Sequence, residues 1–279
     1  MSKTLYLVGT PIGNLEDMTF RAVRILQSVD LIAAEDTRHT GKLLQHFQIT
    51  TPQLSYHKYN QQQRHRELLK RLQRGEAIAL VTDAGMPSIS DPGYELVKAC
   101  IEAEIPVVPI PGVTAVITAL AASGLSGERF IFMGFLPYKN KPRQEQLNSI
   151  KQETRTLIFY EAPHHLLQTL KDLEITLGKS RPIVVARELT KLHEEFWRGT
   201  ITEAIALYTN QRQPKGEYTL VVAGAETTAT LNLSETELKL ELQQLLKQGM
   251  TRSQASRHLA ELTSLSRREI YQLSVNSEQ

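Results

Sequence analysis

The stretch Val81-Thr-Asp-Ala-Gly-Met-Pro-Ser-Ile-Ser-Asp-Pro-Gly93 decides the fold. The apolar run Ala77–Val81 leads into it and predicts a buried strand. A helix is expected to follow, with Asp91 as its N-cap and Pro92 at its first position. The turn between strand and helix is longer than a tight connection needs. In an open α/β sheet, ligands bind at this carboxyl end of the strands, so the stretch predicts both the fold class and a ligand site.

The composition is that of an ordinary soluble globular protein. The chain has 279 residues, 41% of them hydrophobic and 22% charged, which is enough for two domains with sizeable cores. Its net charge of +2 means that a nucleic-acid partner must be argued from local patches. The single cysteine, Cys100, excludes an internal disulfide and is expected to be buried in an apolar helix. No signal peptide or membrane-spanning run is recognisable, which predicts a cytoplasmic protein with no membrane partner.

Strand-like and helix-like segments alternate over the first 122 residues. Apolar runs at residues 4–8, 31–34, 77–81 and 107–110 predict strands, and apolar residues at helical spacing follow them. Because these strand–helix pairs follow one another along the chain, the pattern predicts a parallel sheet with right-handed crossovers. We therefore expect an N-terminal α/β domain over residues 1–116.

A second α/β domain is expected over residues 117–227. Its helices and strands alternate less regularly, which predicts a mixed sheet. Between residues 135 and 143 a basic loop precedes a polar helix, and such a loop can carry function or be an ordinary solvated surface. The expected strands cover residues 130–134, 156–160, 182–186, 195–201 (an edge strand) and a final apolar run that ends near 224.

The C-terminal part of the chain is predicted to be helical. Residues 225–234 are rich in Thr and small residues and are expected to form a linker. A helical domain over residues 235–279 then combines an amphipathic helix at 238–246 with two shorter helices. That pair resembles a helix–turn–helix, which leaves open whether it binds nucleic acid or only packs.

A dense polar cluster follows the second strand, in the sequence Ala34-Glu-Asp-Thr-Arg-His-Thr40. Its acids and histidine could supply a general base or a substrate clamp at a strand end. The alternative is that they cap a helix near residues 41–47, with Arg38 pairing Glu35 or Asp36. The number of polar groups favours a functional role.

Residues 55–74 are the most basic part of the chain. Histidines and tyrosines are interleaved with the positive charges, which suits a surface that binds phosphates and bases. The same stretch also predicts an amphipathic helix with Leu68, Leu69 and Leu72 on its buried side, and the opposite face is then free to meet RNA. The candidate substrate-binding residues are Lys58, Arg64, Arg66, Lys70 and Arg71.

Several motifs, taken together, resemble the tetrapyrrole-methylase superfamily, and within it the bacterial branch that methylates ribosomal RNA. The resemblance covers nearly the whole chain, and the order and spacing of the motifs make it specific. The motifs are the stretch Val81–Gly93 quoted above, Gly9-Thr-Pro-Ile-Gly-Asn14, Ala34-Glu-Asp-Thr-Arg38, Pro111-Gly-Val-Thr-Ala115, Phe159-Tyr-Glu-Ala-Pro-His-His165, Ala186-Arg-Glu-Leu-Thr-Lys191 and Lys215-Gly-Glu-Tyr218.

This resemblance implies the two-domain α/β fold of class III methyltransferases, with S-adenosylmethionine bound in the cleft between the domains of a homodimer. It implies methyl transfer to the ribose 2′-oxygen of a cytidine in the decoding region of 16S rRNA, and hence the small ribosomal subunit as partner. No metal is implied. The cofactor contacts that the resemblance implies are Pro11, Asp83, Ala84, Gly85, Ser88, Thr114, Ala115, Phe159, Tyr160, Ala186, Lys215 and Gly216.

The cofactor's adenine needs apolar walls, and Phe159 and Tyr160 are candidates for them, with plain core packing as the alternative for Phe159. Methyl transfer is an in-line displacement, so that positioning of the two substrates supplies much of the rate. A ribose hydroxyl is a very weak acid, and a base or a strong hydrogen-bond acceptor should help it to attack.

The candidates for that base are Glu35, Asp36, His39 and Glu188. We expect Asp36 to be the group nearest the nucleophile. Arg38 and Lys191 would then bind phosphate or orient the acid.

Two other functions fit parts of the sequence. A tetrapyrrole methyltransferase has the same fold and cofactor, but the basic segment and the helical tail argue against a macrocyclic substrate. A non-enzymatic nucleic-acid-binding protein could use the helical tail, but cofactor-type loops in both α/β domains argue against that function.

Overall fold

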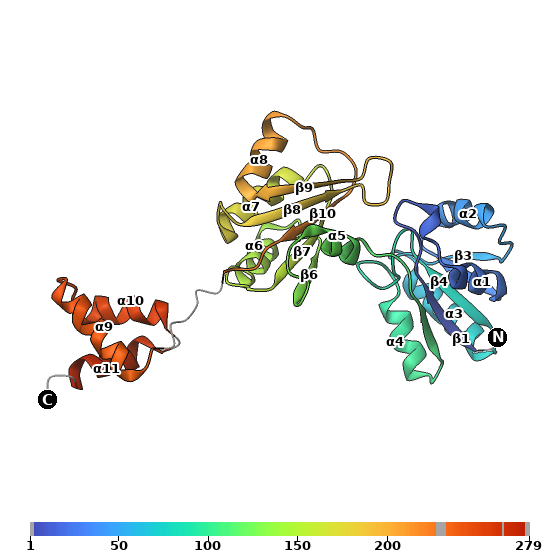
Figure 1. The fold of residues 1–279 in the computed structure, drawn as a ribbon. Coiled ribbons are helices and arrows are strands. Elements are labelled where there is room, and N and C mark those ends of the chain that lie inside the picture. Colours follow the sequence, from blue (N-terminus) through green and yellow to red (C-terminus); the bar gives the residue numbers. More distant parts are fainter. Residues whose placement is uncertain (1–2, 227–232, 264, 277–279) are drawn as a thin grey trace. The chain divides into compact units, whose positions relative to one another are not determined.

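The computed structural model describes residues 3–226, 233–263 and 265–276 (Figure 1). It divides into one compact unit that ends at Gly224 and a second that starts at Ala225. The predicted α/β boundary near residue 116 separates two sheets of the first unit, and the division into two α/β domains stays a prediction. Most of the predicted linker, residues 227–232, lies outside the described residues. Within the described ranges, no helix combines the length and apolar character needed to cross a bilayer.

The first sheet is entirely parallel, as the alternating pattern predicted. Its strand order is β3-β2-β4-β1-β5. Four strands match the predicted bounds. The short third strand was not located from the sequence, because its three residues are only half-buried and carry no apolar run. The strands are β1 (Thr4–Val8), β2 (Leu31–Ala34), β3 (Gln53–Ser55), β4 (Ala77–Val81) and β5 (Val107–Ile110).

Helices cover both faces of this sheet, which explains why its central strands are apolar without alternation. Every residue of β4 is buried. On one face, Ala79 packs in a core with α1 and α2, and on the other Ile78 packs in a core with α3 and α4. Cys100 is buried in the second of these cores, as expected. The helices are α1 (Phe20–Ser28), α2 (Thr37–His46), α3 (Gln61–Gln73) and α4 (Tyr94–Glu102).

The start of α4 differs from the prediction. Asp91 is not the N-cap, because the helix begins at Tyr94 and Gly93 occupies the cap position. The turn before the helix contains three residues with positive φ, namely Ser88 (72°), Ser90 (64°) and Gly93 (143°). Because α-helical residues have φ of about −63°, the helix cannot start before Gly93 and the turn is longer. A side chain at Gly93 would place its Cβ 2.4 Å from Ser88 Oγ, so this turn needs glycine. The helix α2 also begins earlier than predicted, at Thr37 with Asp36 as its N-cap.

The second sheet is mixed, as predicted, with the order β6-β7-β10-β8-β9. The strands β6 and β7 are parallel, and the remaining pairs are antiparallel. The strand β9 lies at an edge, as predicted, and β10 lies in the middle although it is last in sequence. The strands are β6 (Phe130–Gly134), β7 (Thr156–Glu161), β8 (Pro182–Arg187), β9 (Glu195–Thr200) and β10 (Tyr218–Val222).

The two faces of the second sheet have different roles. Leu157 and Phe159 of β7 pack in the larger core with α6 (Asn140–Ser149), α7 (Leu166–Leu177) and α8 (Ile201–Asn210). Ile158 and Tyr160 lie on the opposite face, in the smaller core with α5 (Ala115–Ser123). The pleat alternates side chains between these faces, so that neighbouring residues of β7 meet different surroundings.

The second compact unit contains the predicted helices. They are α9 (Glu235–Lys247), α10 (Arg252–Leu262) and α11 (Arg267–Asn276). Leu238, Leu242, Leu259 and Ile270 bring all three helices into one apolar core. Ser234 and Thr251 start the first two helices with capping boxes, each of which satisfies otherwise unpaired backbone N–H groups. The three helices therefore pack against one another around a core of their own.

Candidate active site

Two adjoining pockets lie where the carboxyl ends of the first sheet's strands meet loops of the second sheet. The first pocket has a volume of about 530 Å³ and the second about 340 Å³. They share Ile12, Ala84 and Glu217 as common wall residues. A ligand in one pocket would therefore lie next to a ligand in the other.

Close backbone contacts hold the loops of this site together. A Cβ on Gly9 would lie 2.7 Å from the Cα of Gly112, so the loops after β1 and β5 touch through glycine alone. Thr10 and Gly85 exchange two backbone hydrogen bonds of 2.9 and 3.0 Å, which join the loop after β1 to the loop after β4. Gly13 in turn lies against Lys191 of the second sheet's loop.

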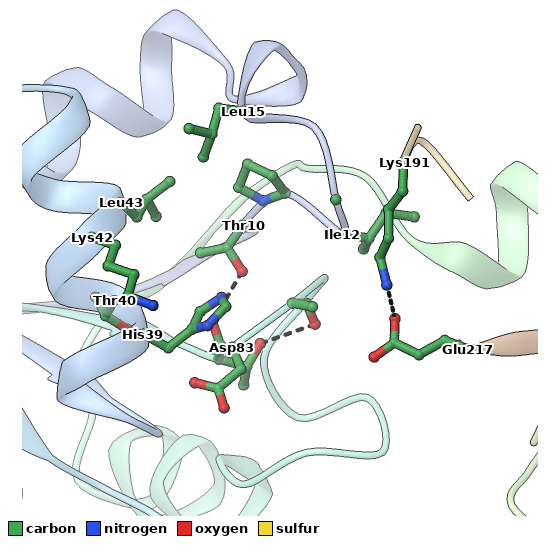
Figure 2. Close-up of a pocket in the computed structure, with 14 residues that line it drawn as sticks. Thr10, Ile12, Leu15, His39, Thr40, Lys42, Leu43, Asp83, Lys191 and Glu217 are labelled. Carbon is green, nitrogen blue, oxygen red and sulfur yellow. Dashed lines mark hydrogen bonds and ion pairs between the residues drawn. The ribbon is translucent and has the colours of Figure 1, made fainter. Parts of the chain in front are cut away.

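The first pocket has basic side chains on opposite sides. His39 and Lys42 approach it from α2, and Lys191 approaches it from the loop after β8 (Figure 2). Lys191 Nζ donates to Glu217 at 2.7 Å and to Glu188 at 2.9 Å. Burial alone would lower the pKa of Lys191, but these two carboxylates raise it, so the ammonium group stays charged.

Glu188 is one of the residues proposed as a base. Burial would raise its pKa, but the hydrogen bonds from Lys191 and from the backbone N–H of Glu217 lower it. Its carboxylate is therefore ionised and already engaged, and it does not line either pocket.

Asp36 and Arg38 form an ion pair at the solvent-facing start of α2. Asp36 accepts hydrogen bonds from the backbone N–H of Arg38 at 2.8 Å and from its guanidinium at 2.7 and 3.1 Å. These hydrogen bonds hold the pKa of Asp36 well below its usual range. Neither residue lines either of the two pockets, whereas His39, the next residue, lines the first. The structure thus shows the alternative that the sequence left open, in which Asp36 caps α2 and pairs with Arg38.

Three further carboxyl groups belong to the carboxyl edge of the first sheet. Glu35 accepts from the backbone N–H of Asp83 at 3.3 Å, and Asp83 accepts from the backbone N–H of Asp36 at 3.1 Å. Burial raises the pKa of Glu35. Burial, and then the charges of Glu35 and Asp83, raise the pKa of Asp91 to about 7. The residue expected to cap a helix is instead a carboxyl that gains and loses its proton near neutral pH.

The second pocket contains many of the residues proposed for the cofactor. Tyr160 and Phe135 supply aromatic wall, with ring centroids 5.6 Å apart. Asp91 and Glu217 add carboxyl groups to the lining, which is otherwise mostly apolar or backbone. Glu161 also lines the pocket, but its carboxylate accepts hydrogen bonds from Thr169 and from the backbone N–H of Ala162. Five proposed cofactor residues line this pocket, namely Ala84, Gly85, Thr114, Ala115 and Tyr160. Pro11, Asp83 and the shared Ala84 line the first.

The other proposed cofactor residues line neither pocket. Phe159 points into the larger core, so its ring forms no adenine wall, because β7 turns it away from Tyr160. Ala186 is buried beneath α5. Ser88 has a buried Oγ for which the described part of the chain offers no hydrogen-bond partner. Lys215 donates its backbone N–H to Tyr218 Oη at 3.1 Å, and Gly216 packs against Glu188.

Sequence reasoning missed Glu217, which lines both pockets. Its position between Gly216 and Tyr218 in a recognised motif was the available signal. Phe135 and Glu161 were also missed as wall residues, since the first belongs to a loop and the second was counted only as part of a motif.

The proposed RNA-binding residues lie on or beside α3. As predicted, Leu68 and Leu72 face the core. Arg64 pairs with Glu67 at 2.6 Å and Arg71 with Glu76 at 2.8 Å. The exposed members, for which the described ranges contain no ion pair, are Lys58, Arg66 and Lys70.

Comparisons with known proteins agree with this architecture. Residues 4–205 match the family model of tetrapyrrole (corrin/porphyrin) methylases. A solved uroporphyrin-III C-methyltransferase from Thermus thermophilus, complexed with S-adenyl homocysteine, is 19% identical with a TM-score of 0.56, covering 79% of this chain and 97% of that one. At that identity the likeness establishes the fold. The fold and the site thus define a methyltransferase of the tetrapyrrole methylase class.

More similar relatives identify the branch. A protein named ribosomal RNA small subunit methyltransferase I from Synechocystis sp. is 63% identical over 98% of both chains. One of the same name from Escherichia coli O157:H7 is 51% identical over 85% of this chain and 86% of its own. The chain belongs to the ribosomal RNA small subunit methyltransferase I family.

The raised pKa of Asp91 predicts a distinctive pH dependence of stability. Between about pH 4 and pH 7 the folded protein keeps a proton on Asp91 that the unfolded chain has lost, so this residue disfavours folding as the pH rises. We expect Asp91→Asn to gain about 1–2 kcal/mol relative to the unmodified protein across that interval, since solvent screens part of the effect. Urea unfolding at a series of pH values measures the difference.

The matched control for this prediction is Asp36→Asn. Because the pKa of Asp36 is lowered in the folded protein, its carboxylate stabilises the fold above about pH 4, and this stabilisation is lost as the pH falls. The control should therefore lose relative stability as the pH rises. Parallel stability curves for Asp91→Asn and the unmodified protein would contradict the assignment to Asp91.

Proposed function

We propose that this chain transfers the methyl group of S-adenosylmethionine to the ribose 2′-oxygen of a cytidine in the decoding region of 16S rRNA, at the family's position 1402. The observation that carries the proposal is the pair of pockets that meet at Ile12, Ala84 and Glu217. One has the lining of a nucleoside site and the other has cationic side chains suited to an RNA strand. The names of the relatives support the substrate, and we further propose a cytoplasmic homodimer that acts on the small ribosomal subunit.

The second pocket fits the cofactor. An adenosine needs apolar walls and a few directed polar groups. Tyr160, Phe135 and Ala115 supply such walls, and the glycine backbone at Gly85 permits a close approach. The unpartnered Oγ of Ser88, in the same turn, is a buried polar atom that lacks a partner within the described chain. When bound, the cofactor supplies an electrophilic methyl group on its sulfonium.

The first pocket would hold the acceptor nucleoside. Lys42 and Lys191 lie on its opposite sides, where they can contact the phosphates that flank the target ribose (Figure 2). Lys191 is fixed by Glu188 and Glu217, so its ammonium group is already oriented before RNA binds. Arg38, directly before His39 in sequence, is exposed and would be a further phosphate contact. Positioning of this kind is the main contribution that a methyltransferase makes to an in-line displacement.

The proton acceptor proposed from the sequence was Asp36, and His39 is better situated for that role. Asp36 is already occupied by Arg38, whereas the His39 ring lies in the wall of the pocket (Figure 2). Glu35 remains a further candidate, but it is hydrogen-bonded to the backbone of Asp83. We therefore propose that Asp36 positions α2 and that His39 takes the hydroxyl proton.

The proposed reaction is tested with methyl-labelled S-adenosylmethionine. We expect label in 16S rRNA when unmodified small subunits or naked 16S rRNA are offered, and resistance to alkaline cleavage after one ribose. A tetrapyrrole offered in parallel should stay unlabelled. Label in the tetrapyrrole alone would reject the RNA substrate, and label on a base instead of a ribose would reject the 2′-oxygen.

The role of His39 is tested by comparing substitutions along α2. We expect His39→Gln to lower kcat about 100-fold or more, the usual contribution of a general base, with S-adenosylmethionine affinity within about twofold. Asp36→Asn keeps a good N-cap and should lower kcat by about tenfold or less. His46→Gln, at the far end of the same helix, is the matched control and should leave turnover unchanged. A larger loss from Asp36→Asn than from His39→Gln would restore Asp36 as the base.

The basic face of α3 is tested through the salt dependence of RNA binding. Neutralising Lys58, Arg66 and Lys70 together to Gln should reduce the slope of log K against log salt by about 2–3, since each lost phosphate contact removes about 0.9. The matched control is Arg64→Gln with Arg71→Gln, which removes two cations already paired with carboxylates. Equal slopes for all three proteins would leave this face as ordinary solvated helix.

A further inference from the structure

A group of exposed or half-exposed rings and lysines lies beside the second pocket and takes no part in the mechanism above. Tyr138, Lys139 and Lys141 come from the loop and helix start after β6, and His164 and His165 come from the turn after β7. We call these five residues the Tyr138 platform. Tyr138 is 71% exposed, although a tyrosine of a soluble protein usually buries most of its ring.

The rings of the platform contact one another across two loops. The centroids of Tyr138 and His165 are 4.9 Å apart, and those of His165 and His164 are 4.2 Å apart. The ring planes are tilted by 53° and 54° respectively, so that the rings are not stacked face to face on one another. The ring of Tyr138, which is 71% exposed, therefore remains open to a flat partner.

The platform is continuous with the second pocket. Phe135, three residues before Tyr138, lines that pocket and contacts Tyr160 inside it. Pro163, directly before His164, lines the pocket as well. Both loops that carry the platform thus also form the pocket wall.

A buried ion pair fixes these loops. Arg143 Nε lies 2.7 Å from Asp172 of α7, and both side chains are only 11% exposed. The same guanidinium donates to Thr169 at 2.8 Å and to the carbonyl of Pro137 at 3.4 Å, next to Tyr138. Thr169 donates to Glu161, which accepts from the backbone N–H of Ala162 in the other loop. One network therefore holds both loops in place, which is what a preorganised binding surface requires.

The charge of the platform favours an anionic partner. Lys139 and Lys141 are exposed, and the described ranges give their side chains no ion pair. The neighbouring carboxylates Asp172 and Glu161 face inward and are hydrogen-bonded, and Glu145, one turn into α6, is the exposed acid nearest in sequence. Open ring faces beside cations are the pattern with which proteins bind unpaired bases and their phosphates.

From the ring contacts, the buried anchor and the local charge we infer that the Tyr138 platform binds unstacked nucleotides of the RNA substrate that flank the one in the active site. This inference rests on the proposed function and extends it, since it assigns single-stranded RNA to a surface outside both pockets. The basic face of α3 would contact phosphates, whereas the platform would hold bases. A target nucleotide must leave its stack to enter an active site, and a surface that holds its neighbours would favour that state.

Binding of the full-length protein to a fluorescent 12-nucleotide single-stranded cytidine oligoribonucleotide tests this inference, with the same strand in a duplex as the comparison. We expect Tyr138→Ala with His165→Ala to weaken single-strand binding about tenfold or more, because base stacking on a ring contributes on that scale. Duplex binding should change less than twofold. The single substitution Tyr138→Phe keeps the ring, so this variant should bind the single strand with the affinity of the unmodified protein.

The matched control is Phe20→Ala, which removes a 98% exposed ring from α1. Binding of S-adenosylmethionine and the dimer content of each variant are measured in parallel. Unchanged single-strand affinity in the double variant would overturn the inference, and so would loss of a dimer in that variant, which would assign the platform to a second copy of this chain. Failure of the unmodified protein to methylate 16S rRNA would instead reject the proposed function, so the two failures are distinguishable.

Discussion

The site depends on a contact that leaves no room for a side chain. The backbone at Gly9 approaches Gly112 so closely that a Cβ on either glycine would lie less than 3 Å from the other. This contact follows from the strand order, since β1 lies between β4 and β5 and all three strands end at the same edge. It leads the loop after β1 across to Gly85, where Thr10 forms its two backbone hydrogen bonds. Both pockets are built on the loops joined in this way.

The pleat of one strand then separates stability from function. Phe159 fills the core on one face of the second sheet, and Tyr160 lines a pocket on the other. A one-residue shift in the register of β7 would exchange them. The pairing of β7 with both β6 and β10 prevents such a shift. Because Phe159 is fixed in the core, its neighbour Tyr160 is fixed in the pocket wall.

Much of this architecture could be predicted from local patterns. Strands such as Ala77–Val81 are continuous apolar runs, and that property is visible without tertiary information. The start of α4 was mispredicted because Asp91-Pro92 has the composition of a helix start, whereas positive φ values at Ser88 and Ser90 extend the turn. Asp36 was recognised as important, but whether it faces the pocket or Arg38 depends on side-chain orientation. Glu217 was missed for a similar reason, because its partner Lys191 is 26 residues away in sequence.

The place of β10 in the second sheet has a consequence for biosynthesis. The first sheet can close once residue 110 has been made, because β5 is its last strand. The second sheet lacks its middle until Tyr218–Val222 is available to pair with β7 and β8 on either side. During translation the edges of those two strands therefore stay open while more than thirty residues are added, in the state in which unpaired edges invite aggregation. The nascent chain should thus become independent of chaperones only late, when the last strand of the second sheet has left the ribosome.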